Sequence, residues 1–182
     1  MKKDSIKKHL AKYRIHQKRS TTINHAFASA IAPCDLYDQE KVSAALLFLG
    51  QDPEGNLLCV FCEGRAQTWD HLVSLVSKGE LRGYGHQIGN LVPCCKDCNS
   101  SKGSKDFKDF VENFSGIKSD RKALSERLEN YLKMFTRPVD IHLLETRVPE
   151  QWRRYQEVKK QIVDAMKEAD ELADVLRTQI VE

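Results

Sequence analysis

The 182-residue sequence lacks any run of about 18 apolar residues, the length that a membrane-spanning helix needs. Its basic N-terminus also lacks the apolar core of a secretory signal peptide. Long-period repeats and low-complexity segments are absent as well. These absences predict a cytoplasmic protein with no membrane partner. In that reducing compartment the six cysteines are expected to bind metal rather than to form disulfides.

Charge is distributed unevenly along the chain. Residues 1–20 hold eight Lys or Arg and one acid, Asp4, which gives this segment a charge of +7. The whole chain has a formal net charge of only +3, so the remaining residues carry −4. A basic arm of this kind is typical of nucleic-acid binding, and a solvated tail without a ligand is the alternative.

Hydrophobic spacing predicts helices at both ends and two short strands in the middle. The predicted helices cover residues 36–49, about Asp97 to Phe114, 119–134 and 149–181, with a weaker stripe at Ile6, Leu10 and Tyr13. The predicted strands lie near Thr68–Val73 and Asn90–Pro93, whereas residues 20–33 are small and mixed and give no clear pattern. We therefore expect an α+β chain with a basic helical N-terminal region (1–50), a core (51–116) and a helical C-terminal region (117–182).

Four cysteines form two matched pairs, Cys59-Val-Phe-Cys62 and Cys95-Lys-Asp-Cys98, with 32 residues between the pairs. Each pair can place two thiolates on one metal ion, and two pairs complete the tetrahedral site that zinc prefers. Because such a site has no open position, the zinc is expected to be structural. Cys94 is an alternative to Cys95 as a ligand, and the isolated Cys34 is expected to be a small buried side chain.

The segment between and after these pairs carries Asp70-His71, then Asn90 within Gly89–Pro93, and finally Asn99 followed by Lys102-Gly103. Taken in this order with the cysteines, it resembles the HNH endonuclease family, which has a ββα-metal fold. The resemblance covers about residues 57–114. The last motif position, which is often His in the family, is Asn99 here.

The chemistry of phosphodiester hydrolysis needs these residue types. A neutral imidazole, His71, can take the proton of the attacking water as a general base. Asp70 and Asn99 offer the hard oxygen ligands that a catalytic Mg²⁺ or Mn²⁺ prefers. The resemblance implies that Asn90 ties the loop through side-chain-to-backbone hydrogen bonds without touching the metal. It also implies a distorted strand, with His71 polarised by a backbone carbonyl, because adjacent strand residues otherwise point to opposite faces.

These features predict a metal-dependent endonuclease that hydrolyses DNA and serves restriction or phage defence. A non-catalytic, zinc-stabilised DNA-binding module is one alternative, and a nuclease that acts on RNA or without sequence preference is another. Two further residues have open roles. His86 could bind phosphate or the metal, and Lys102 could contact phosphate or neutralise the thiolates.

The C-terminal helix is expected to form a homodimer. Its apolar residues alternate at spacings of three and four, namely Tyr155, Val158, Ile162, Ala165, Ala169, Leu172 and Leu176. A two-fold dimer would present two sites to opposite strands of a palindromic target. The alternative is that this helix folds back on residues 119–134 of the same chain.

Overall fold

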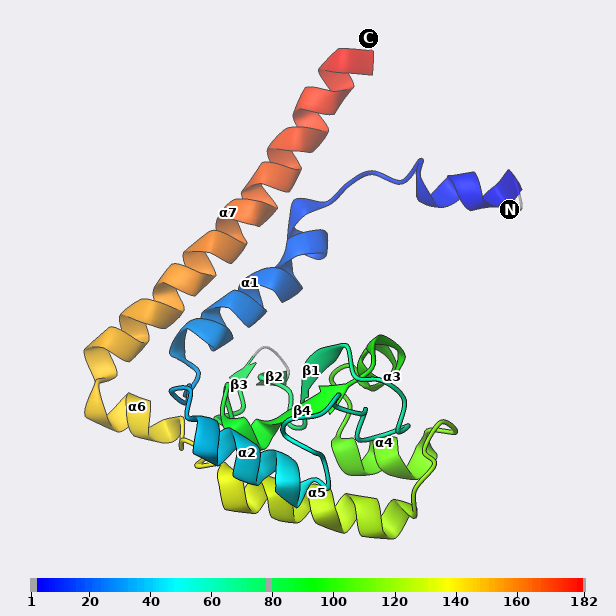
Figure 1. Ribbon diagram of the computed structural model, residues 1–182. Helices are drawn as coiled ribbons and strands as arrows, with labels where there is room; N and C mark the ends of the chain where they lie inside the picture. The colour runs from blue at the N-terminus through cyan, green and yellow to red at the C-terminus, as the bar shows by residue number, and fades with distance from the viewer. Residues whose placement is uncertain (1–2, 78–79, 182) are drawn as a thin grey trace. The chain divides into compact units, whose positions relative to one another are not determined.

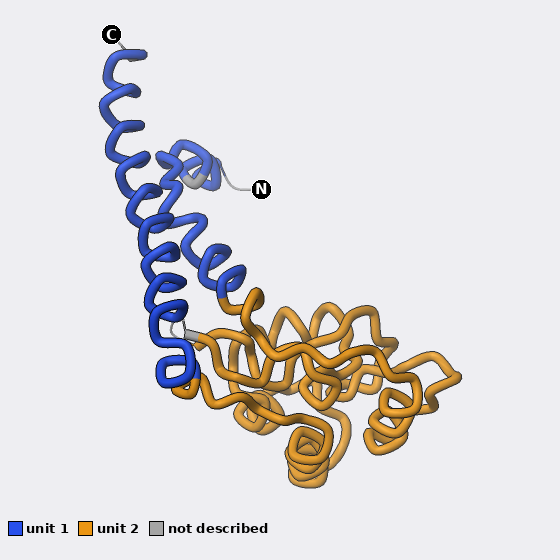
Figure 2. Tube along the Cα trace, turned by 90° about the vertical axis from the view of Figure 1, so that its left-hand side faces the viewer, with its two compact units in different colours: residues 1–27, 144–182 blue, residues 28–143 orange. Residues whose placement is uncertain are grey.

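The computed structural model describes residues 3–77 and 80–181; residues 1–2 of the basic arm, 78–79 and 182 lie outside it. The chain forms two compact units, one of residues 28–143 and one that combines residues 1–27 with 144–182 (Figure 2). This division differs from the three regions expected from the sequence, because helices on both sides of residues 51–116 supply the core of the central unit. None of the described helices has the length and apolarity that crossing a membrane requires.

The central unit combines short strands with helices, which confirms the α+β class (Figure 1). Its elements are α2 (Gln39–Phe48), β1 (Thr68–His71), β2 (Val76–Ser77), β3 (Glu80–Leu81), η2 (Ile88–Asn90), β4 (Leu91–Cys94), α3 (Lys96–Lys102), α4 (Phe107–Asn113) and α5 (Arg121–Phe135). Strands β1 and β4 pair antiparallel, with Asp70 opposite Val92 and His71 opposite Leu91. A second antiparallel pair joins β2 to β3.

Local capping explains where the helices of this unit begin. The side chains of Asp38, Asp106 and Asp120 accept hydrogen bonds from backbone N–H groups in the first turns of α2, α4 and α5. The single helix expected from Asp97 to Phe114 is wrong, because Gly103 ends α3 at a positive φ of 51° and Asp106 then starts α4. The predicted aromatic face nevertheless packs, since Phe110 meets Phe61 edge to face with ring centroids 5.1 Å apart.

The core of the central unit lies where α2, α4 and α5 meet the sheet and the cysteine-bearing turn. Leu124, Leu128 and Tyr131 follow one face of α5 and are buried. The Tyr131 hydroxyl donates to the backbone oxygens of Ile88 and Leu91, at 2.7 and 2.8 Å. These bonds anchor η2 and the start of β4 to α5. Helix α5 therefore fixes the position of the segment that precedes the second cysteine pair.

The other unit contains η1 (Lys3–Lys8), most of α1 (Ile15–Ile31) and α7 (Pro149–Val181). The boundaries between the units fall within α1 and within the short helix α6 (His142–Arg147). The Asp170 carboxylate in α7 accepts the backbone N–H groups of Ile15 and His16, at 2.6 and 3.1 Å. Farther along, the Tyr155 hydroxyl donates to the Phe27 oxygen at 2.8 Å. Helix α7 therefore packs against α1 of the same chain, a partner that the sequence analysis did not consider.

Two sequence expectations for this unit are wrong. The sequence pattern of residues 20–33 predicts no element, but α1 runs through them to Ile31. The stripe of Ile6, Leu10 and Tyr13 forms no continuous helix, and all three side chains are exposed. The distal part of α7 keeps an exposed apolar stripe, made of Leu172, Val175, Leu176 and Ile180.

Candidate metal centre and hydrolytic site

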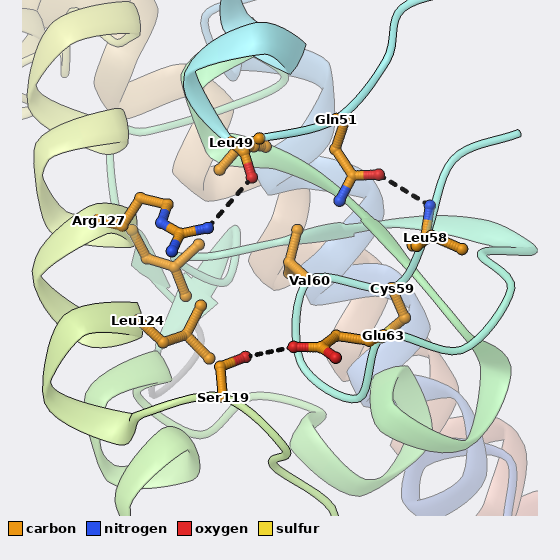
Figure 3. Close-up of a pocket in the computed structure, with 11 residues that line it drawn as sticks. Leu49, Gln51, Leu58, Cys59, Val60, Glu63, Ser119, Leu124 and Arg127 are labelled. Atoms are coloured by element: carbon orange, nitrogen blue, oxygen red, sulfur yellow. Dashed lines mark hydrogen bonds between the residues drawn. The ribbon is translucent and has the colours of Figure 1, made fainter. Parts of the chain in front are cut away.

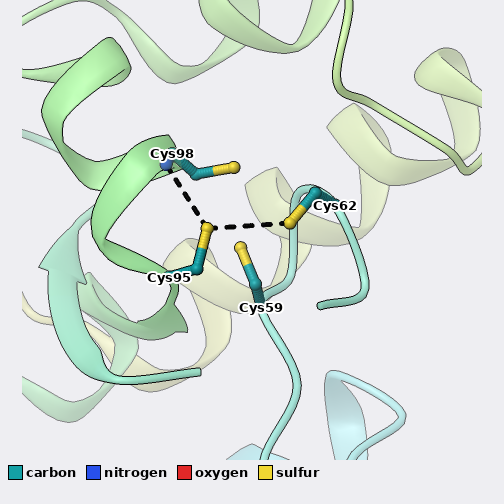
Figure 4. Close-up of side chains that lie close together, drawn as sticks. All are labelled: Cys59, Cys62, Cys95 and Cys98. Atoms are coloured by element: carbon teal, nitrogen blue, oxygen red, sulfur yellow. Dashed lines mark hydrogen bonds between the residues drawn. The ribbon is translucent and has the colours of Figure 1, made fainter. Parts of the chain in front are cut away.

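The four predicted cysteines converge on one point (Figure 4). The Sγ atoms of Cys59, Cys62, Cys95 and Cys98 all lie within 4.8 Å of one another, and those of Cys62 and Cys95 are 3.7 Å apart. Zn–S bonds of about 2.3 Å in a tetrahedron put neighbouring sulfurs about 3.8 Å apart. The cluster therefore has the donor set and the dimensions of a structural metal site that suits zinc.

Two kinds of local structure present these thiols. Cys59 and Cys62 stand on a tight turn, in which Glu63 N–H donates to the Cys59 oxygen at 2.9 Å and Glu63 has a positive φ of 59°. Cys95 caps α3, where its Sγ accepts the Cys98 N–H at 3.4 Å. The N-terminus of α3 thus faces the sulfurs with its free N–H groups, which favours thiolate charge there.

The remaining two cysteines lie outside the cluster, which answers the choice between Cys94 and Cys95 in favour of Cys95. Cys94 is buried on β4, with its Sγ 3.9 Å from that of Cys59, and its thiol donates to the Cys95 oxygen at 3.3 Å. Cys34 is exposed rather than buried, because it lies in the segment between α1 and α2, away from the core.

The thiol pKa values show why this cluster favours a cation. Burial raises the pKa of Cys62 and of Cys98, whereas the hydrogen bond with Cys94 lowers the pKa of Cys59 to about 4. Several buried thiolates cannot accumulate without a positive charge among them. A divalent metal bound by the sulfurs would supply that charge.

The segment just before α5 contacts the cysteine-bearing turn, and α5 itself contacts the end of α2 (Figure 3). The Ser119 hydroxyl donates to Glu63 Oε1 at 2.8 Å, and an Arg127 Nη1 group donates to the Leu49 oxygen at 3.4 Å. Between them lies a cavity of about 240 Å³ that reaches Cys59. These contacts explain why a helix beyond residue 116 belongs to the central unit.

Asp70 is buried in β1 and paired with a buried lysine of α3. Lys102 Nζ lies 3.1 Å from Asp70 Oδ2 and donates to the His71 backbone oxygen at 2.6 Å. The ion pair lacks hydrogen-bond geometry, so Oδ2 has no hydrogen-bond donor among the described residues. Burial raises the pKa of Asp70, and the Lys102 ammonium opposes that rise. Neither role expected for Lys102 describes it, since its side chain is fully buried and its partners are Asp70 and a carbonyl rather than phosphate or a thiolate.

His71 lies against His86, which comes from the connection before η2. His71 Nε2 and His86 Nδ1 are 3.1 Å apart, and the two ring planes make an angle of 65°. Burial, followed by the charges of His86 and Lys102, lowers the pKa of His71 to about 4. The His71 imidazole is therefore neutral near pH 7. Its ring pairs with this histidine rather than with the backbone carbonyl that the resemblance implied.

Asn90 is fully buried and ties together the segments that carry the two histidines. Its Nδ2 donates to the oxygens of Val73 and Gly85, at 3.0 and 2.9 Å, and its Oδ1 accepts the Val73 N–H at 2.8 Å. These are the side-chain-to-backbone bonds expected of it. Val73 follows His71 by two residues and Gly85 directly precedes His86, so the clamp holds both imidazoles in place.

Glycine is required at the point where this connection passes the segment after α1. Gly85 has a positive φ of 59°, and a Cβ there would lie 2.1 Å from the Pro33 oxygen. The next residue, His86, donates its N–H to that same oxygen at 2.8 Å. The backbone on both sides of the His86 side chain is thereby fixed.

Asn99 lies on α3, one turn before Lys102, and is half-buried. Within residues 3–77 and 80–181, no hydrogen bond of its side-chain amide is found. The β1–β4 register is regular through His71, so the pairing of these strands shows no distortion of the kind that the resemblance implied. Lys102 therefore links the Asp70 carboxylate to the His71 backbone oxygen. Asn99 lies on the same helix as Lys102, which packs on β1, but makes no such link among the described residues.

Comparisons of the chain with protein-family models, with curated proteins and with solved structures find no match. The resemblance to HNH endonucleases thus rests on the motif residues alone. The function that follows is argued from the site itself.

Proposed function

We propose that this protein is a metal-dependent HNH endonuclease that hydrolyses DNA phosphodiester bonds. The observation that carries the proposal is a neutral, half-buried imidazole, His71, held at 3.1 Å by His86 and positioned by the Asn90 clamp. A buried carboxylate, Asp70, lies on the same strand. A module that only binds DNA has no need for this combination.

Zinc at the four cysteines is part of the proposal and has a structural role. The cluster joins the turn before β1 to the start of α3, and so fixes the ends of the strand–strand–helix segment. A closed site with four sulfur ligands leaves no position for water, so the hydrolytic chemistry belongs to Asp70, His71 and Asn99.

His71 acts as the general base. When its Nε2 carries the proton shared with His86 Nδ1, its Nδ1 has a free lone pair for the proton of a water molecule. The water oxygen then forms a bond to phosphorus, the bond from phosphorus to the leaving oxygen breaks, and that oxygen takes a proton from solvent. His86 positions His71 by holding this tautomer.

The oxygen donors near His71 fit a hard divalent cation. Asp70 Oδ2 is buried and has the Lys102 ammonium at 3.1 Å but no hydrogen-bond partner among the described residues, and Asn99 on α3 would add an amide oxygen. Lys102 favours the ionised form of Asp70, which cation binding needs. A Mg²⁺ or Mn²⁺ ion held there would stabilise the charge that develops on the phosphate.

The direct test is cleavage of plasmid and phage DNA with Mg²⁺ or Mn²⁺, with RNA as a parallel substrate. His71→Ala should abolish cleavage and leave zinc content and folding intact, and EDTA should stop the wild-type enzyme. His25, an exposed histidine of α1, offers the matched control His25→Ala, which should cut normally. Cleavage by His71→Ala near the wild-type rate would rule out the proposed base. DNA binding without cleavage by the wild-type chain would favour the non-catalytic module.

A homodimer through α7 is a further part of this proposal. The exposed apolar stripe at Leu172, Val175, Leu176 and Ile180 lies beyond the part of α7 that Phe27 covers. Burying it against a second copy would remove apolar surface from water. Two sites related by a two-fold axis suit cleavage of both DNA strands.

A further inference from the structure

A hollow lies directly beside the histidine pair, and the proposed hydrolysis does not use it. Its volume is about 320 Å³, and its lining is mainly apolar and aromatic. The lining residues that matter here are Tyr37, Leu46, Trp69, His86, Leu91 and Tyr131. All of them belong to the central unit.

Strand geometry explains why this hollow adjoins His71. Trp69 and His71 are two residues apart on β1, so their side chains share one face of the sheet. Leu91 lies opposite His71 on β4 and continues that face. His86, which contacts His71 on one side, lines the hollow on the other.

Hydrogen bonds hold the segment that carries Tyr37 against the segment that carries His86. Asp35 N–H donates to the His86 oxygen at 3.2 Å, and Asp35 Oδ2 accepts the Ile88 N–H at 2.9 Å. Lys41 Nζ lies 3.1 Å from the same carboxylate oxygen, so the charge of Asp35, which lines the hollow, is paired. Yet Tyr37 is 81% exposed and Trp69 is 47% exposed, so folding alone does not account for these aromatic side chains.

The position of the hollow limits what can occupy it. Any group that enters it lies next to His86, whose partner His71 takes the proton of the attacking water, so we expect the occupant to be part of the substrate strand. A phosphate does not suit an apolar, aromatic lining, whereas a nucleobase has a flat face that stacks on Tyr and Trp. A base inside a duplex has both faces covered, so the bound base must be unpaired or extruded.

We propose that this hollow binds one unpaired nucleobase of the substrate strand, next to the phosphodiester that His71 hydrolyses, by stacking on Tyr37 and Trp69. The proposal rests on the nuclease function and adds a substrate class to it. The substrate is then single-stranded DNA or a distorted duplex, rather than a regular double helix.

The chain supplies its own reporter for this base. Trp69 and Trp152 are its two tryptophans, so Trp152→Phe leaves Trp69 as the single tryptophan, whose emission can be excited selectively over that of tyrosine. This full-length variant is titrated, without divalent cation, with oligothymidylate of about 12 nucleotides, a length that covers one binding surface. Single-stranded oligonucleotide should quench Trp69 emission. An abasic oligonucleotide of equal length and the matching duplex should quench it far less.

Substitution then identifies the stacking side chain. Tyr37→Ala should weaken binding of the oligonucleotide by about 5- to 150-fold, the range expected for one stacked base. Leu47 is 62% exposed on the neighbouring helix α2 and does not line the hollow, so Leu47→Ala is the control that should bind normally.

The outcomes separate this inference from the nuclease proposal. Cleavage with Mg²⁺ or Mn²⁺ but no quenching of Trp69 would refute the base-binding hollow and keep the nuclease. Quenching without cleavage would support the hollow and refute the nuclease. Equal quenching by the abasic oligonucleotide, or normal binding by Tyr37→Ala, would also refute the stacking role. Occupation of the hollow by an apolar dye but by no oligonucleotide would mark it as a protein-docking surface, and the inference would be wrong.

Discussion

Replacing Asn90 by alanine tests whether this single amide positions the histidine pair. The substitution removes two donated hydrogen bonds and one accepted bond, all to backbone groups of Val73 and Gly85. Each bond contributes about 1 kcal/mol net, and buried groups left without a partner cost more. We therefore expect Asn90→Ala to lower the free energy of unfolding by about 3 to 5 kcal/mol.

A loss of that size is a large part of the total stability of a domain, which is about 5 to 15 kcal/mol. The measurement is urea unfolding of the full chain, followed by circular dichroism, with stability taken from the midpoint and slope. Cleavage should fall as well, because the segments that carry His71 and His86 are no longer tied to each other.

Asn113→Ala is the matched control. Asn113 donates one hydrogen bond to the Asp109 oxygen within α4, and that bond is exposed. Its loss should change the stability by no more than about 0.5 kcal/mol. If Asn90→Ala were as stable as Asn113→Ala, the three bonds would not hold the connection, and the positioning argument would fail.

Three further predictions concern the metal, the buried ion pair and the dimer. Metal analysis should find about one zinc per chain. Cys98→Ser should lose the zinc and unfold the central unit, whereas Cys34→Ser should keep the zinc and the fold. A folded chain free of zinc would contradict the proposed zinc cluster. Lys102→Met leaves the Asp70 carboxylate buried without its cation, so urea unfolding should show that the free energy of unfolding falls by about 3 to 5 kcal/mol. Adding Asp70→Asn to this variant removes the unpaired charge and should restore the stability. Light scattering at micromolar concentration should show a dimer that Leu176→Glu dissociates, and a monomeric wild-type chain would exclude this interface.

The helices that were predicted well carry their signals locally. Helix α7 begins at Pro149, a residue that favours the first helical turn, and α2 and α5 follow Asp38 and Asp120, whose side chains cap them. The apolar residues of α5 also repeat at the helical period. Capping and periodicity both depend on residues a few positions apart, which is why the sequence alone indicates them.

The features that were missed depend on residues far apart in the chain. The first turn of α1 is completed by Asp170, which is 155 residues beyond Ile15. The pairing of His71 with His86 requires the chain to turn back over 15 residues, and that of Lys102 with the His71 oxygen spans 31. No local pattern indicates such contacts. The sequence therefore indicated the four-cysteine cluster, whose residues lie close in two short pairs, but not the contacts of His71 and Lys102.

The path from the cysteines to the strand suggests a way in which a closed metal site would affect the proposed hydrolysis. Helix α3 is seven residues long, with Cys95 as its N-cap, Cys98 in its first turn and Lys102 as its last residue. A metal at the cysteines fixes the start of this rigid helix, so it also fixes the lysine at its end, which holds Asp70 and the His71 carbonyl. Loss of the metal would release α3 and leave Asp70 without its cation, although no zinc ligand touches the substrate. A gradual removal of zinc should therefore reduce cleavage in parallel with zinc content, while Mg²⁺ or Mn²⁺ alone should not restore it.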